Sequence, residues 1–303
     1  MHKSVLLDES IEALNIKSDS IIVDCTLGYG GHSSEILKQV GNGYLYSFDQ
    51  DIDAIKFSNN RLKQINNNYE IIKSNFVNIR AELYRRGIKG VDGIIYDLGV
   101  SSPQLDTQER GFSFHSDARL DMRMDKDNLL DAYKVVNEYS YENLVKIFRE
   151  YGEEKYASSI ARGIIKSRPI NTTLELVEVV KANVPEKYRR EKHPARKVFQ
   201  AIRIEVNDEL NVFEKSLKDS LELLNVGGRI CVITFHSLED KICKNIFKSV
   251  SELDSALKKL PIIPDGLRPK YKVLKSITPS NAELDKNNRA RSAKLRIIER
   301  VSE

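Results

Sequence analysis

The chain has 303 residues and is poor in the residues that build several classes of protein. It has no tryptophan and only three cysteines, Cys25, Cys231 and Cys243, which lie far apart and form no Cys-x-x-Cys pair. This argues against a disulfide scaffold or a cysteine zinc site and is typical of a reducing cytoplasm. No apolar run approaches the roughly 18 residues of a membrane span, and the N-terminal run is too short for a signal peptide. We therefore expect a cytoplasmic protein with no membrane partner and no bound metal.

Neither sign of charge dominates the composition. Forty-eight Lys and Arg face 44 Asp and Glu, giving a net charge of +4, which permits a nucleic-acid partner without requiring one. The positive charge gathers in two stretches, Lys187 to Lys197 and Lys286 to Arg300, each with six positive residues and one negative. RNA phosphates would suit both stretches, and an ordinary solvated face is the competing interpretation.

Strand-like and helix-like segments alternate along both ends of the chain. The predicted strands of the first hundred residues are Ile21 to Cys25, Tyr44 to Phe48, Glu70 to Ile72 and Asp92 to Leu98, with helices at Ser33 to Val40 and Asp51 to Leu62. Alternation resumes with a helix at Asp208 to Leu224 ended by Gly227 and Gly228, a strand at Arg229 to Phe235, a helix at Ser237 to Val250, and a closing antiparallel pair, Tyr271 to Ile277 with Ala293 to Ile298. This predicts an α/β fold with a mostly parallel sheet.

The middle of the chain breaks the alternation. From 105 to 194 the sequence is charged and helix-like, with no convincing buried strand. We therefore predict one α/β core formed by 1–104 and 195–303, interrupted by an inserted helical domain over 105–194.

A cofactor site is predicted where the first four strands end. The first strand leads into Gly28-Tyr29-Gly30-Gly31-His32, and glycines let a backbone approach a ligand closely. In open α/β sheets ligands bind beyond the carboxyl ends of the strands. There, Asp49 can hold ribose hydroxyls, Phe76 can cover an adenine ring, and Asp97 closes the fourth strand. A bare turn with solvated acids is the other interpretation.

Two cofactor classes fit such a site. A dinucleotide needs G-x-G-x-x-G, and counting from Gly28 the last glycine is replaced by Ser33. S-adenosylmethionine carries no phosphate and suits acids at successive strand ends, here Asp24, Asp49 and Asp97. The pattern favours S-adenosylmethionine over a nicotinamide dinucleotide. His32 is expected to position the cofactor rather than to transfer a proton.

The loop after the fourth strand suits an amine acceptor. It runs Ser101-Ser102-Pro103-Gln104, and we assign it the acceptor role together with Asp97. The lone pair of an exocyclic base amine is delocalised into the ring, so acceptors must orient its N–H groups and take up the proton. The nearby Arg110, Phe112 and Phe114 suit a flipped base, and a buried lid is an equally good interpretation.

Long motifs in a fixed order resemble those of the bacterial ribosomal RNA small subunit methyltransferase H family. The matching segments include His2 to Glu9, Thr26 to Ser33, Asp97 to Asp106, Arg110 to Phe114, Leu120 to Asp125, Tyr151 to Glu154, His193 to Arg196, Phe199 to Ala201 and Phe235 to Asp240. The resemblance runs nearly end to end. It implies a class I methyltransferase fold and S-adenosylmethionine-dependent methylation of N4 of a cytidine in 16S rRNA of the small ribosomal subunit.

The resemblance also implies site residues. Cofactor contacts carry over to Gly30, Gly31, His32, Asp49, Phe76, Asp97 and Gln104. The resemblance places His236 near the substrate side. The other predicted RNA contacts come from the arginine–aromatic segment and the first basic stretch rather than from the resemblance: Arg110, Phe112, Phe114, Arg189, Arg190, Lys192 and Arg196. Related amino-methyltransferases often have two prolines and an aromatic residue after the fourth strand, whereas here Pro103 is followed by Gln104. The ring that stacks on the cytosine is therefore open between Phe112 and Phe114.

Two alternatives to this reading stay open at the level of sequence. One is a non-catalytic RNA-binding ribosome assembly factor on a methyltransferase fold, and the other is a nicotinamide-dependent oxidoreductase. A homodimer is also left open.

Overall fold

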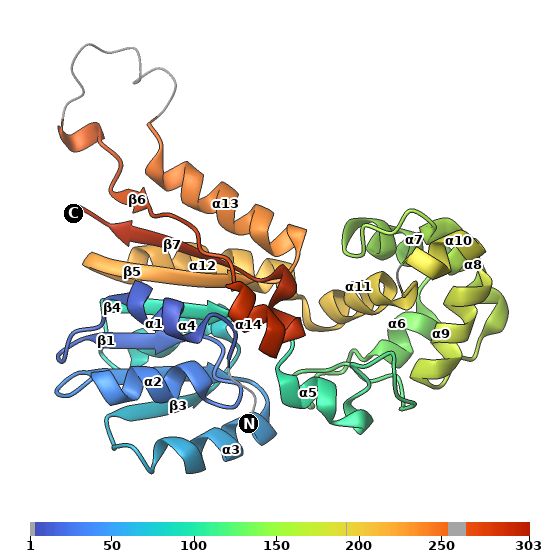
Figure 1. Ribbon diagram of the computed structural model, residues 1–303, viewed down its shortest axis with the longest axis horizontal. Coiled ribbons are helices and arrows are strands. Elements are labelled where there is room, and N and C mark those ends of the chain that lie inside the picture. Colours follow the sequence, from blue (N-terminus) through green and yellow to red (C-terminus); the bar gives the residue numbers. More distant parts are fainter. Residues whose placement is uncertain (1–3, 192, 254–264) are drawn as a thin grey trace. The chain divides into compact units, whose positions relative to one another are not determined.

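The computed structural model describes residues 4–191, 193–253 and 265–303 and divides into two compact units (Figure 1). We call Met1–Gly99 with Leu210–Glu303 the core unit, and Val100–Glu209 the inserted unit. The units begin and end near the domain limits expected from sequence, except at the second junction. Helix α11 (Ala195–Asn207) was expected in the α/β core, but its apolar face belongs to the hydrophobic core of the inserted unit.

A seven-stranded sheet forms the centre of the core unit. Its strands are β1 (Ile21–Asp24), β2 (Tyr44–Asp49), β3 (Tyr69–Lys73), β4 (Val91–Asp97), β5 (Leu224–Thr234), β6 (Tyr271–Val273) and β7 (Lys294–Arg300). They lie in the order β3-β2-β1-β4-β5-β7-β6. The first five are parallel to one another, and β7 is antiparallel to both its neighbours. The carboxyl ends of β1 to β5 therefore meet at one edge of the sheet, which we call the sheet head. The predicted α/β class is confirmed.

Helices cover both faces of this sheet (Figure 1). On β5, Ile230 and Val232 face one hydrophobic cluster while Cys231 and Ile233 face another, as the period of two in a strand requires. The first cluster includes side chains of α4 (Ile79–Arg85), α12 (Glu209–Leu223) and α13 (Ser237–Ser251). The second includes side chains of α1 (Leu7–Leu14), α2 (Gly31–Gln39), α3 (Ile52–Leu62), α14 (Asn281–Lys286) and the 3-10 helix η5 (Asn288–Ser292). A strand buried on both faces explains the near-continuous apolar runs in the sequence.

Two details differ from the predicted elements. Gly227 and Gly228 do not end a helix, because β5 begins at Leu224 and contains them. The pairing of β5 with β4 jumps from Val91–Leu224 to Gly93–Arg229, so the glycines lie in an irregularity of the strand. The predicted closing antiparallel pair is present, with β6 limited to three residues.

The inserted unit is helical and has its own core. Beside α11 it contains α5 (Ser102–Asp106), η2 (Gln108–Arg110), α6 (Ala132–Glu138), α7 (Tyr141–Glu150), α8 (Ala157–Ser167), α9 (Thr173–Ala182) and α10 (Glu186–Glu191). Helix α7 shows why these segments form: Ser140 caps its first turn, and Leu144, Ile147 and Phe148 bury one face. Apart from Lys192, residues 100–209 are all described, and their only strand-like pairing is an isolated bridge between Arg119 and Thr172.

Within the described part of the chain, no helix is both long and apolar enough to cross a membrane. The remaining short elements are the 3-10 helices η1 (Phe76–Asn78) and η4 (Asp265–Leu267).

Candidate active site

The glycine loop between β1 and α2 is held open by side chains of neighbouring elements. Gly28 and Gly30 have φ values of +49° and +70°, which other L-residues adopt only with strain. The Gly28 amide donates a 2.9 Å hydrogen bond to Asp49 Oδ2, and the Ser58 hydroxyl donates a 2.7 Å bond to the Gly28 carbonyl oxygen. The loop that sequence analysis singled out is therefore tied directly to the acid at the end of β2.

Asp49 is set into protein at the sheet head. Its Oδ1 accepts a 2.8 Å hydrogen bond from the Asp51 amide. Desolvation raises the pKa of Asp49 to about 7, and the charges of Asp51 and Asp24 add to that rise, while the two backbone donors oppose it. Asp49 is thus poised to ionise near neutral pH and can accept further hydrogen bonds from a ligand.

Asp24 lies beneath the glycine loop and has a structural role. The carboxyl is 1% exposed, and it accepts hydrogen bonds of 2.6 Å from the Ser33 hydroxyl and 3.0 Å from the Thr26 amide. Burial raises its pKa. Because its visible bonds all go to the loop and to α2, Asp24 stabilises the turn rather than presenting an open acceptor.

Asp97 and His32 are neighbours, and each has a buried polar atom without a hydrogen-bond partner. His32 Nδ1 lies 3.6 Å from Asp97 Oδ2, and within the described residues neither His32 Nε2 nor Asp97 Oδ1 has a hydrogen-bond partner. Desolvation lowers the pKa of His32 to about 4, and a hydrogen bond with the Val5 backbone opposes this fall. His32 is therefore neutral at pH 7, which disfavours an ion pair with Asp97.

The environment of Asp97 favours its protonated form in the ligand-free protein. Desolvation, together with the smaller effect of the negative charges of Asp24 and Glu239, raises the pKa of Asp97 to about 8. Its side chain is still 26% exposed, so a ligand can reach it. Buried polar atoms without partners cost free energy, and a polar or cationic ligand at this point would remove that cost.

Phe76 and His236 stand at the ends of the neighbouring elements. Phe76 begins η1 after β3, is partly exposed, and meets Tyr96 edge-on with ring centroids 5.6 Å apart. His236 follows β5, whose Ile233 pairs in register with Asp97 of β4. The structure therefore brings Gly30, Gly31, His32, Asp49, Phe76, Asp97 and His236 to the sheet head.

Glu239 is a residue of this region that the sequence prediction did not select. It is 3% exposed, its Oε2 accepts a 2.7 Å hydrogen bond from the Phe235 amide, and its Oε1 lies 3.0 Å from His236 Nε2. Its position three residues after His236, in the first turn of α13, was the available signal. Glu239 therefore fixes the backbone at the end of β5 by accepting from the Phe235 and His236 amides, while neither ring nitrogen of His236 has a hydrogen-bond partner among the described residues.

The loop assigned to amine binding belongs to the inserted unit. The Ser101 amide donates to Gln104 Oε1 at 3.1 Å, and the Gln104 amide donates to Ser101 Oγ at 3.4 Å. These reciprocal bonds stabilise the turn into α5. The side chains of Ser102 and Pro103 lie outside the described part of the structure. The acceptor role of this loop stays a prediction.

Two of the predicted RNA contacts, Arg110 and Phe112, are buried in the structure. Arg110 is 8% exposed, and its guanidinium donates hydrogen bonds of 2.8 and 3.3 Å to the carbonyl oxygens of Arg123 and Met124. Phe112 is 6% exposed and lies in the core of the inserted unit, with Arg110 over its ring. This packing is what the buried-lid interpretation expects, and an RNA role for the two residues stays a prediction.

The other predicted RNA contacts differ in accessibility. Phe114 is partly buried, stacks on His193 with ring centroids 4.5 Å apart and meets Phe199 edge-on. Arg189, Arg190 and Arg196 are exposed, with Arg190 paired to Glu186. Lys192 lies outside the described residues. An RNA role for the exposed arginines stays a prediction.

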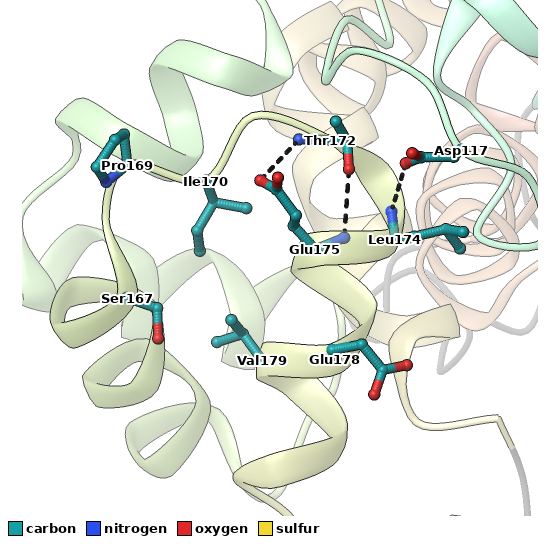
Figure 2. A pocket seen from close by; sticks show the side chains of 9 residues that line it. All are labelled: Asp117, Ser167, Pro169, Ile170, Thr172, Leu174, Glu175, Glu178 and Val179. Carbon is teal, nitrogen blue, oxygen red and sulfur yellow. Dashed lines mark hydrogen bonds between the residues drawn. The ribbon is translucent and has the colours of Figure 1, made fainter.

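A separate pocket lies within the inserted unit and contains none of the predicted site residues. Its cavity measures about 530 Å³, and the residues around it, drawn in Figure 2, are Asp117, Ser167, Pro169, Ile170, Thr172, Leu174, Glu175, Glu178 and Val179. Glu175 and Thr172 bond to each other as the capping box of α9, so their polar atoms are used by the helix itself. The pocket offers no acid–base or cofactor chemistry comparable to the sheet head.

Comparison with known proteins shows the family of the chain. The model of the MraW methylase family matches residues 1–301. The chain belongs to the MraW methylase family. A curated relative, the ribosomal RNA small subunit methyltransferase H of Exiguobacterium sibiricum, is 54% identical over 308 residues, which cover 100% of this chain and 99% of the relative. This MraW methylase thus matches its relative over the full length of both proteins.

Solved structures whose backbone resembles that of this chain include an rRNA methylase from Streptococcus thermophilus and TrmN from Thermus thermophilus. The first is 13% identical, with a TM-score of 0.45 and coverage of 100% of this chain and 99% of the other. The second is 10% identical, with a TM-score of 0.43 and coverage of 97% and 48%. The strand order of this MraW methylase, with β7 antiparallel between β5 and β6, is the class I methyltransferase architecture.

Proposed function

We propose that the chain methylates the exocyclic N4 amine of a cytidine in 16S rRNA of the small ribosomal subunit, with S-adenosylmethionine as the methyl donor, and that it does so in the cytoplasm. Family membership and the name of the 54% identical relative support this reaction class. The single observation that carries the proposal is the pair of buried acceptor atoms without a partner among the described residues, His32 Nε2 and Asp97 Oδ1, beside the glycine loop at the sheet head.

The residues present fit the methyl donor. Asp97 Oδ1 and His32 Nε2 lack partners, and both are acceptors suited to the ammonium group of a methionine moiety. Asp49 can accept from ribose hydroxyls while it holds Gly28, and the partly exposed ring of Phe76 can cover an adenine. Gly30 has a φ of +70°, and a Cβ on Gly31 would collide with Ser4, so the loop needs glycine at both positions to keep this conformation beside the donor. When bound, S-adenosylmethionine supplies a methyl carbon made electrophilic by the positive sulfur.

The chain's own residues then have to orient a weak nucleophile. We assign Asp97 and the turn of Ser101, Ser102 and Pro103 to this task, with the carboxylate and the loop oxygens accepting from the two N–H groups of the amine. Such acceptors direct the nitrogen lone pair toward the methyl carbon and take up the proton that the nitrogen releases. Gln104 stabilises the turn by accepting from the Ser101 amide.

Incubation with methyl-labelled S-adenosylmethionine and small-subunit particles that lack the modification tests the function. We expect label on one cytidine of 16S rRNA, and fragmentation of that nucleoside should place the methyl group on the exocyclic nitrogen. Labelling on carbon 5 or on a ribose oxygen would refute the proposed acceptor. Binding to the particles with no transfer of label would instead support the RNA-binding assembly factor.

A further inference from the structure

The direction of β7 divides the C-terminal basic stretch between the two edges of the sheet. Because β7 is antiparallel to β5, its first residue, Lys294, pairs with Thr234 at the sheet head. Its far end pairs Glu299 with Arg229, at the opposite edge. The residues that precede β7, in α14 and η5, therefore enter the strand from the edge where the cofactor site lies. The sequence stretch of Lys286 to Arg300 is not one surface.

The two arginines of β7 make hydrogen bonds within the fold. The Arg296 guanidinium makes a two-pronged pair with Asp240 at 2.5 and 2.9 Å, and its side chain is 14% exposed. Arg300 donates a 2.7 Å hydrogen bond to the Leu224 carbonyl oxygen and is 19% exposed. Neither guanidinium is well placed to bind an external anion.

The cations before β7 are exposed. Lys286, Arg289 and Arg291 are all exposed, and Asp285 is the exposed acid of the same segment. Within the described residues, Lys286 and Arg291 have no carboxylate partner. The backbone beneath them is fixed, since Ala290 and Ala293 are buried in the core of the sheet face. An anchored segment with exposed cations suits a polyanion that follows its surface.

The same segment is connected to the glycine loop through the N-terminal residues. Glu283 of α14 accepts a 2.8 Å hydrogen bond from the Leu6 amide, and Leu6 is fully buried with a φ of +49°. The neighbouring Val5 backbone bonds to His32, and a Cβ built on Gly31 would come within 1.9 Å of Ser4 Oγ. The chain from Ser4 to Leu6 therefore links α14 to the loop predicted to hold the methyl donor.

From this arrangement we propose that Lys286, Arg289 and Arg291 form a phosphate-binding surface for the rRNA strand, on the core unit beside the methyl-donor site. The proposal rests on the proposed rRNA substrate and adds where the RNA backbone is held. Each lysine or arginine that neutralises a phosphate releases counterions, so binding should weaken with salt in proportion to the number of contacts.

The full-length double variant Lys286→Ala with Arg291→Ala tests this surface. Its matched control is Lys17→Ala with Lys89→Ala, which removes two exposed cations just before β1 and β4, at the edge opposite the sheet head. The measurement is the dissociation constant for a 16S rRNA fragment against salt concentration. We expect the head variant to flatten the slope of log affinity against log salt by about 1.4, from roughly 0.7 per single-strand phosphate contact. We expect the control to keep the wild-type slope.

Equal slopes for the head variant and the wild type, or equal losses in both double variants, would overturn the proposal. Binding of S-adenosylmethionine, measured by calorimetry, should be unchanged in the head variant, which shows that a lost slope does not reflect a damaged fold. The dissociation constant for the RNA is measured without any methyl transfer, so this test does not depend on catalytic activity. If wild-type protein binds the fragment with the expected salt dependence but methylates nothing, the proposed function fails and the surface stands.

Discussion

At the scale of single residues, Asp49 both stabilises the glycine loop and lies where the ribose of the cofactor is expected. It fixes Gly28 through one carboxylate oxygen and Asp51 through the other, and it lies where a ribose is expected. Hydrogen bonds to a charged group contribute about 1.5–3 kcal/mol each. Asp49→Ala should therefore weaken S-adenosylmethionine binding at least tenfold in calorimetry. Asp19→Ala, at an exposed position before β1, is the control and should bind normally. Unchanged affinity in Asp49→Ala would contradict the ribose assignment.

Arg110 is buried and Arg196 is exposed, so replacing each one distinguishes the effect of burial on stability from the effect of losing a positive charge. Replacing Arg110 by alanine leaves two carbonyl oxygens in the inserted unit without their donor, which should cost about 2–3 kcal/mol in urea unfolding. Arg196→Ala, at an exposed position, should change the free energy of unfolding by less than about 0.5 kcal/mol. If the two variants were equally stable, Arg110 would not have the structural role described.

The sequence alone could not distinguish these two arginines. Both lie in charged segments without a clear period, and the acceptors of Arg110 come from a chain segment 13 and 14 residues later that folds back over it. Nor could the sequence show that Phe112 lies in the core of the inserted unit. By contrast, Asp49 and Asp97 could be predicted, because the end of a parallel strand fixes where its last side chain lies.

At the scale of elements, the strands and helices of the core unit follow from their apolar periodicity. What periodicity does not specify is the partner of an apolar face. Helix α11 shows a clear apolar face, yet only the hydrophobic cluster that this face shares with Phe148 and Ile164 reveals that the helix belongs to the inserted unit. Likewise, the sequence predicts that Gly227 and Gly228 end a helix, whereas in the structure they lie in an irregularity of β5.

The glycine loop provides an element-level test. Gly30 has a φ of +70°, and a Cβ there would lie 3.2 Å from Ser58 Oγ. Gly87 has a similar φ of +76° with no atom within 4 Å of such a Cβ. Gly87→Ala should cost about 1–2 kcal/mol of stability from backbone strain alone. Gly30→Ala should cost more and should also weaken S-adenosylmethionine binding, which Gly87→Ala should leave intact.

Urea unfolding and calorimetry on the two alanine variants provide the readouts. Equal affinity for S-adenosylmethionine in both variants would show that the loop around Gly30 is not in contact with the donor.

At the scale of the whole molecule, the acids at the sheet head make stability depend on pH. The pKa values of Asp49 and Asp97 are raised to about 7 and about 8 in the ligand-free protein, against about 3.9 for an unfolded aspartate. Between these values the folded chain retains protons that the unfolded chain has released. The free energy of unfolding should therefore fall as the pH rises from about 4 to about 8.

The variant Asp97→Asn tests this linkage by thermal melting across that range. It should match the wild type near pH 4, where Asp97 is protonated, and should be more stable above pH 8 by an amount on the order of 1 kcal/mol, because the side chain is partly exposed. A constant difference between the two proteins at all pH values would rule out the raised pKa as its cause.

The most direct test of the whole account is a crystal structure with S-adenosylhomocysteine, the product of the methyl donor. We expect the adenine ring to pack against Phe76 and the ribose hydroxyls to donate hydrogen bonds to Asp49. The amino-acid end should lie along Gly30 to His32, with its ammonium group bound to Asp97. A ligand bound instead in the pocket of Thr172 and Glu175, or one that leaves Asp49 and Asp97 without contact, would contradict it.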